Sequence, residues 1–119
     1  MPETPRTFIE LITTYKETTT LCNAGEAAVK IKTEVGLVVV DVREPAEFKE
    51  AAIPGAVNIP RGFLEFKIAQ SCPEADQPIL LQCKTGGRAV LAARTLSELG
   101  YKNVIAYQGT VEELLAEIE

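Results

Sequence analysis

Residues 79–88 read ILLQCKTGGR and combine a short apolar run, a cysteine, two glycines and two cations. The apolar run predicts a buried strand, and a helical pattern follows from about Ala89. A strand that ends on Cys83 and turns through glycines into a helix aims backbone N–H groups and the positive end of the helix dipole at the sulfur. Lys84 and Arg88 add positive charge beside it. The segment therefore predicts a reactive-cysteine loop that favours an anionic sulfur.

An inert, buried cysteine at a strand end is the alternative interpretation of this loop. Such a cysteine needs neither two glycines nor two cations around it, so the reactive interpretation is favoured. Cys22 and Cys72 lack these surroundings, and we interpret each as a small buried or loop residue.

Apolar runs and helical patterns alternate along the rest of the chain. The predicted strands are 21–22, 37–40 with Asp41 at its end, 56–59, 79–82 and 103–107, and the predicted helices are 7–16, 24–34, 45–50, 63–68, 89–99 and 111–118. Such alternation implies right-handed crossovers and a parallel sheet with helices on both faces. The expected fold is a three-layer α/β/α domain with a central, mainly parallel, five-stranded sheet. Asp41 and Cys83 follow two of its strands, so one cleft at the carboxyl edge should hold both.

Length and composition place limits on the function. A chain of 119 residues suits one domain with a single core. The net charge of −5 argues against nucleic acid as a partner, because phosphate binding needs a basic face. The absence of histidine excludes Cys-His proteases, Ser-His-Asp hydrolases and most zinc chemistry, and we expect no metal.

Cysteine usage and hydropathy bear on the compartment. Three dispersed cysteines are too few for a disulfide framework or for paired metal ligation, which indicates a reducing compartment. The chain shows neither a leader-like start nor an apolar run of about 18 residues. We therefore expect a cytoplasmic protein without a membrane partner.

Five motifs occur in a fixed order along the chain. They are DVREPAEF at 41–48, IPGAVNIP at 53–60, RGFLEF at 61–66, CKTGGR at 83–88 and LGYKNV at 99–104. This ordered set resembles the single-domain rhodaneses, the thiosulfate sulfurtransferase family, over residues 21–119. Residues 1–20 would then form an N-terminal extension with a helix.

The resemblance implies roles for individual residues. Cys83 would be the sulfur-accepting nucleophile of a rhodanese-type sulfurtransferase. Its persulfide would lie in a cradle formed by Lys84, Thr85, Gly86, Gly87 and Arg88, in which Lys84 and Arg88 would bind the anionic donor. Asp41 and Arg43 would support the loop, with Glu47 as a partner for Arg43.

The implied chemistry needs no cofactor beyond the covalent persulfide. Thiosulfate or a low-molecular-weight persulfide would donate the sulfur, and cyanide, a small thiol or a protein thiol would accept it. Three departures from the family pattern affect the pocket rather than the nucleophile: Ala52 replaces a frequent His, Ala89 replaces a frequent Ser or Thr, and the usual Trp after the last strand is absent.

Two other functions remain open. Cysteine-loop phosphatases and arsenate reductases also cradle an oxyanion between Cys and Arg, but their pattern resembles a loop one residue longer than Lys84–Gly87. A non-catalytic rhodanese-like binding or regulatory module is the other alternative, and such modules usually lack the cysteine that this chain retains. A P-loop is excluded because no Lys-Ser/Thr pair follows the second glycine.

Overall fold

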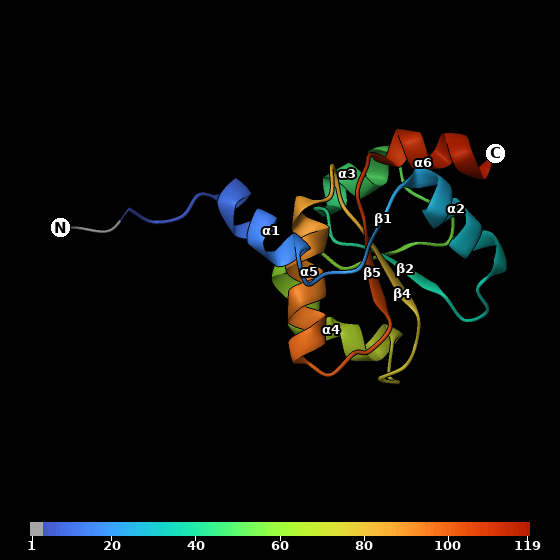
Figure 1. Cartoon of the computed structure of the whole chain (residues 1–119). Coiled ribbons are helices and arrows are strands. Elements are labelled where there is room, and N and C mark those ends of the chain that lie inside the picture. The colour runs from blue at the N-terminus through green and yellow to red at the C-terminus, as the bar shows by residue number, and fades with distance from the viewer. Residues whose placement is uncertain (1–3) are drawn as a thin grey trace.

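The fold is a five-stranded parallel sheet, described here for residues 4–119 from a computed structural model (Figure 1). The strands are β1 (Leu21–Cys22), β2 (Val38–Asp41), β3 (Val57–Asn58), β4 (Ile79–Gln82) and β5 (Val104–Tyr107). Their spatial order is β1-β5-β4-β2-β3, and every neighbouring pair is parallel. The predicted α/β class and five-stranded sheet are confirmed.

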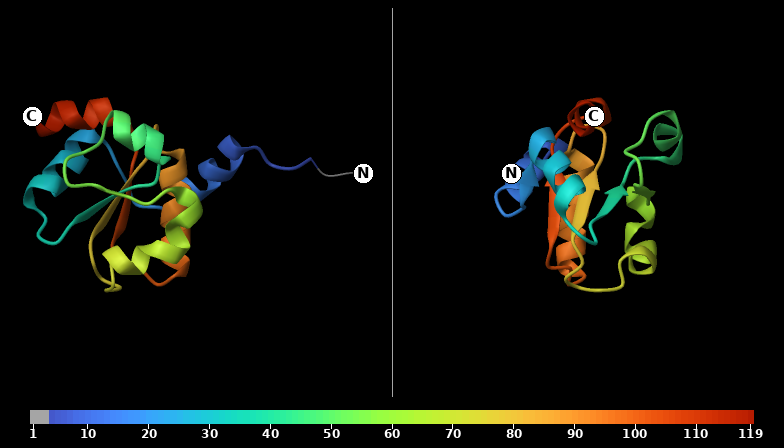
Figure 2. Two further views of the ribbon diagram at one scale, coloured as in Figure 1. Left: turned by 180° about the vertical axis from the view of Figure 1, so that it is seen from behind. Right: turned by 90° about the vertical axis from the view of Figure 1, so that its right-hand side faces the viewer.

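Helices cover both faces of the sheet. One face, the α5 face, carries α1 (Phe8–Lys16), α4 (Leu64–Ser71) and α5 (Gly87–Glu98), while the opposite α2 face carries α2 (Ala24–Thr33) and α6 (Val111–Ile118) (Figures 1 and 2). A short helix, α3 (Pro45–Glu50), follows β2, and a 3₁₀ turn, η1 (Arg61–Phe63), precedes α4. The three layers predicted from the sequence are therefore present.

The core is divided by the sheet into two clusters. Val40 and Leu81 point into the cluster under α5, whereas Val39 and Leu80 point into the cluster under α2. This is the two-residue alternation of a pleated strand, and it explains why strands covered on both faces read as continuous apolar runs. All four β4 residues are buried, and each fully buried leucine stabilises the fold by roughly 1.5–3 kcal/mol.

Capping residues fix where several helices begin. Thr7 caps α1, Asn23 caps α2 and Thr110 caps α6, each in a reciprocal capping box with a glutamate three residues later. These boxes are local in sequence, which is why the starts of these helices were predictable.

Two aromatic side chains and one leucine differ from expectation. In the segment predicted as an amphipathic helix at 63–68, Leu64 and Ile68 are buried, but Phe63 and Phe66 are exposed. The buried pair is four residues apart and shares one helix face, which the two aromatics do not share. Leu99, the last residue of the helix predicted at 89–99, is also exposed because it lies at the C-cap of α5, beyond the last buried turn.

No helix within residues 4–119 is long and apolar enough to cross a membrane. The predicted division into an N-terminal extension, residues 1–20, and a domain, residues 21–119, stays a prediction. Residues 1–3 of the extension lie outside the described part of the chain. The helix expected in that extension is present as α1, and it packs against α5.

Candidate active site at the Cys83 loop

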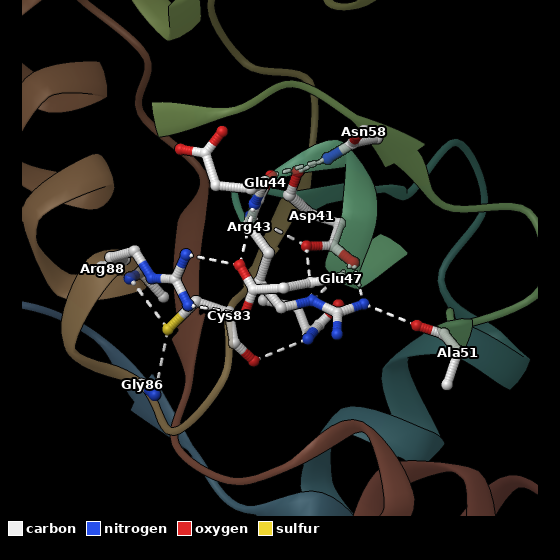
Figure 3. Close-up of polar contacts among 11 residues, drawn as sticks. Asp41, Arg43, Glu44, Glu47, Ala51, Asn58, Cys83, Gly86 and Arg88 are labelled. Carbon is white, nitrogen blue, oxygen red and sulfur yellow. Dashed lines mark hydrogen bonds and ion pairs between the residues drawn. The ribbon is translucent and has the colours of Figure 1, made fainter. Parts of the chain in front are cut away.

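The loop from Cys83 to Gly86 joins the central strand β4 to α5 and curls around the Cys83 sulfur (Figure 3). The Sγ atom accepts hydrogen bonds from the backbone N–H of Gly86 at 3.0 Å and of Ala89 at 3.4 Å. Ala89 lies in the first turn of α5, so the sulfur is at the positive end of the helix dipole. With 1% of its surface exposed, Cys83 is enclosed by the protein.

Gly86 adopts a backbone conformation that other residues rarely adopt. Its φ is 120°, and a Cβ atom on it would lie 2.6 Å from Gln108 Oε1. Gln108 follows β5, and its Nε2 donates to the Gly86 carbonyl at 3.1 Å. The torsion angle therefore favours glycine at this position, and a Cβ atom would in addition displace the Gln108 side chain.

Arg88 forms a two-point ion pair with Glu47 from α3 (Figure 3). Nη1 donates to Oε1 at 2.9 Å and Nη2 donates to Oε2 at 3.1 Å. The hydrogen bonds from Arg88 lower the pKa of Glu47 to about 2. The same hydrogen bonds, with the charge of Glu47, raise the pKa of Arg88.

The prediction that Glu47 partners Arg43 is therefore wrong. Arg43 binds Asp41 instead: Nε donates to Oδ1 at 3.0 Å, and Nη2 donates to Oδ2 at 2.6 Å. Only Val42 lies between these two residues in the chain, and the Asp41 carboxylate is fully buried where β2 ends, so Arg43 supplies the nearest countercharge. The hydrogen bond with Asp41 raises the pKa of Arg43.

This buried pair fixes the edge of the sheet around the loop. Arg43 Nη2 also donates to the carbonyl of Ala51 at 2.7 Å, which holds the end of α3. Asn58 Nδ2 donates to the carbonyls of Asp41 and Arg43, both at 3.0 Å, and joins the end of β3 to the end of β2. Asp41 and Arg43 thus hold the platform from which Glu47 reaches Arg88.

Lys84 and Thr85 are exposed at the tip of the loop. They line a cavity of about 250 Å³ together with Arg43, Glu47, Glu50, Ala51, Thr110, Val111 and Glu112. The cavity has three carboxylates and two cations, and Arg88 does not line it. The predicted positive site is thus present only locally, at Lys84, which makes no ion pair with any residue in the range 4–119.

Two glutamines hold the loop, and neither was identified as a site residue from the sequence. Gln108 lies directly after β5, in the region where the sequence lacks the family's usual Trp. Gln82 is fully buried, and its Nε2 donates to the Cys83 carbonyl at 2.6 Å. Its Oε1 has no hydrogen-bond partner among the described residues. A polar residue at the end of an otherwise apolar buried strand was the available signal for Gln82.

The other two thiols lie away from the loop, in the core. Cys22 is in the cluster under α2 and Cys72 is in the cluster under α5, and both are buried. Burial raises the pKa of Cys22 to about 11 and raises that of Cys72. Both therefore remain protonated at neutral pH, in agreement with their interpretation as small core residues. Within the described part of the chain, no cluster of acidic and cysteine side chains is arranged to hold a metal ion.

Comparison with curated proteins finds thiosulfate sulfurtransferases among the relatives. Thiosulfate sulfurtransferase PspE of Escherichia coli is 32% identical over 65 residues, which are 55% of this chain and 62% of that protein. Thiosulfate:glutathione sulfurtransferase of Saccharomyces cerevisiae is 30% identical over 93 residues, which are 69% of this chain and 67% of that protein. The chain spans a smaller share of a third relative, a putative sulfur carrier protein of Bacillus subtilis, of which the match covers 40%.

Solved structures show the same fold. A protein of Rhodopseudomonas palustris, described as a possible tyrosine phosphatase, superposes with a TM-score of 0.82 at 27% identity, covering 98% of this chain and 95% of that one. The human single-domain sulfurtransferase TSTD1 superposes with a TM-score of 0.70 at 25% identity, covering 83% and 97%. The family model described as the rhodanese-like domain matches residues 16–117, which include the whole sheet, α2 to α5 and all of α6 except its last residue. The chain belongs to the rhodanese-like domain family.

Proposed function

We propose that the protein is a sulfurtransferase in which Cys83 carries the transferred sulfur as a persulfide. The observation that carries the proposal is the pair of backbone N–H groups, from Gly86 and Ala89, aimed at Sγ from a short loop at a helix N-terminus. Such preorganised donors stabilise negative charge on sulfur as an oxyanion hole does on oxygen. No histidine is needed, because neither step requires proton abstraction from a weak nucleophile once the thiolate has formed.

The reaction has two displacements on sulfur. The Cys83 thiolate attacks the outer sulfur of thiosulfate, the S–S bond of thiosulfate breaks, and sulfite leaves with the electron pair. A thiolate or cyanide acceptor then attacks the outer sulfur of the persulfide, the Cys83 S–S bond breaks, and the Cys83 thiolate returns. Neither displacement therefore requires a cofactor or an external oxidant.

The choice of donor and acceptor draws on the relatives. The E. coli and yeast proteins are named for thiosulfate as donor, and the yeast protein for glutathione as acceptor. We propose thiosulfate or a small persulfide as the donor for this chain and a small or protein thiol as the acceptor. Lys84 is the exposed cation beside the loop, whereas Arg88 binds a donor anion only when its pair with Glu47 opens.

Mass spectrometry of the intact protein tests the proposal. After incubation with thiosulfate and removal of excess donor, the wild-type protein should gain one sulfur atom and lose it on addition of cyanide. Cys83→Ser should gain none, while Cys22→Ala and Cys72→Ala should behave as the wild type. Sulfur retained by Cys83→Ser, or none on any variant with wild-type folding, would contradict the assignment.

A phosphatase is the second candidate, because a structural neighbour is described as a possible tyrosine phosphatase. Two features of this site argue against it. Four residues separate Cys83 from Arg88, one fewer than in the longer phosphatase-like pattern, and both outer guanidinium nitrogens of Arg88 are bonded to Glu47 rather than free for phosphate oxygens. Hydrolysis of an aryl phosphate that is lost in Cys83→Ser would favour the phosphatase.

A binding module without catalysis is the remaining alternative, and the same sulfur-loading experiment addresses it.

A cytoplasmic location is proposed together with the activity, because the three cysteines are free thiols, as expected in a reducing compartment.

A further inference from the structure

The N-terminal helix α1 lies against α5 at the end that carries the cysteine loop (Figures 1 and 2). Its first residue is Phe8, fixed by the capping box of Thr7 with Glu10. One turn later, Ile12 is buried in the same core cluster as Cys83 and Ala89. The helix is therefore anchored in the core beside the site.

The Phe8 ring lies against Gly87, although Phe8 is 49% exposed. A Cβ atom placed on Gly87 would lie 2.7 Å from Phe8 Cζ and 2.8 Å from Cε2, closer than carbon atoms approach, so the ring rests against the glycine. Gly87 is the first residue of α5 and lies between Gly86 and Ala89, the two donors to the Cys83 sulfur. Its lack of a side chain is what leaves room for the ring.

We propose that Phe8 is a positioning residue of the sulfur-transfer loop. The ring restrains Gly87, and this restraint keeps the N–H groups of Gly86 and Ala89 directed at Sγ. The role in turnover rests on the proposed function, whereas the restraint on the loop does not. The proposal also gives a role at the site to a residue outside the family match, which begins only at the last residue of α1.

Alkylation of Cys83 by iodoacetamide measures the restraint without any sulfur donor. Because Cys83 is 1% exposed, the reagent reaches it only when the loop opens. Phe8→Ala should raise the alkylation rate of Cys83 by about five- to tenfold, as expected when a local restraint on opening is removed. Cys22 and Cys72, which are buried elsewhere, report on global opening in the same sample.

Two further variants sharpen the test. Ile9→Ala removes the neighbouring apolar side chain, which is 65% exposed, and is the matched control that should leave the Cys83 rate unchanged. Gly87→Ala should displace the ring and raise the Cys83 rate as Phe8→Ala does. Since both substitutions break the same contact, the double variant should react no faster than either single variant.

Turnover supplies a readout that a merely structural role would not move. Phe8→Ala should lower kcat for sulfur transfer by about tenfold, because displaced donors stabilise the persulfide less well, with little change in KM for thiosulfate. Phe8→Leu keeps an apolar side chain without adding an atom at the Cζ position that faces Gly87, and should restore part of kcat.

The proposal is overturned if Phe8→Ala leaves the Cys83 alkylation rate unchanged, or if Cys22 and Cys72 accelerate in parallel with Cys83. A change in KM alone, without a change in kcat, also overturns it. If the wild-type protein takes no sulfur from thiosulfate, the proposed function fails, and the alkylation rates still decide whether Phe8 restrains the loop.

Discussion

Glu47→Gln should have opposite effects on stability and on donor binding, because Glu47 engages the only arginine of the cysteine loop. The substitution keeps the shape of the side chain but removes its charge and turns one of its two acceptors into a donor that faces the guanidinium. A hydrogen bond to a charged group contributes about 1.5–3 kcal/mol, and an exposed ion pair at most about 1 kcal/mol. Both side chains are about a third exposed, at 31% and 32%, so solvent screening favours the lower range.

We therefore expect Glu47→Gln to lower the free energy of unfolding at pH 7 by about 1 kcal/mol, or Tm by about 4 °C for a domain of this size. Chemical denaturation in urea measures the first quantity. Glu50→Gln is the matched control, because Glu50 lies on the same helix, lines the same cavity and has no ion-pair partner in the described part of the chain. Glu50→Gln should lower the free energy of unfolding by much less than Glu47→Gln does.

The stability difference should depend on pH in a defined direction. The pKa of Glu47 is lowered to about 2 in the folded protein, from about 4.3 in an unfolded chain. A depressed folded-state pKa contributes stability that is complete above the unfolded value and lost as the pH falls through the folded value. The gap between wild type and Glu47→Gln should therefore narrow from about pH 4.3 towards pH 2, and a gap that stays constant over this range would refute the reasoning.

Donor binding should change in the opposite sense. Without Glu47 the Arg88 guanidinium is free to bind thiosulfate, so KM for thiosulfate should fall in Glu47→Gln by more than in Glu50→Gln, which removes the same charge without freeing an arginine. Steady-state kinetics with thiosulfate and cyanide measures this. An increase in KM would show that the pair orients Arg88 for the donor rather than withholding it.

Three further substitutions test other parts of the site. Gly86→Ala should destabilise the protein by about 1–2 kcal/mol and reduce sulfur loading of Cys83, because its φ of 120° disfavours any residue with a Cβ atom, which would also displace the Gln108 side chain from the loop; wild-type stability in urea would contradict this. Arg43→Met should cost about 3–5 kcal/mol by leaving the Asp41 carboxylate buried without its partner, and thermal unfolding near the wild-type Tm would argue against that role. Lys84→Ala should raise KM for thiosulfate more than KM for a neutral persulfide donor, and an equal effect on both donors would remove the electrostatic role of Lys84.

The order of strands and helices and the nature of the loop were readable from the sequence. Apolar runs, capping boxes and glycines act over a few residues, so their signals are written locally in the chain. The cysteine loop at 83–88 also carries a local signal. Cysteine, glycines and cations within this one short segment indicated a sulfur at a helix N-terminus, and the structure has the Cys83 Sγ atom there.

The sequence did not predict which side chains from different helices and strands would pair. Glu47 could have paired with either arginine, and the choice depended on where α3 lies relative to the loop once Arg43 is held by the buried Asp41 carboxylate. The helical pattern likewise predicted an amphipathic segment at 63–68 but not that Phe63 and Phe66 would face solvent.

The packing of α1 on the cysteine loop was decided by the tertiary structure alone. Sequence periodicity predicted the helix, yet residues Phe8 and Gly87 are far apart in the chain and meet only because α1 docks on α5. Local sequence determines which segments become helix or strand because the controlling hydrogen bonds span a few residues. Which charged and aromatic groups meet at the loop is determined by the packing of the three layers, since those contacts join segments from all parts of the chain.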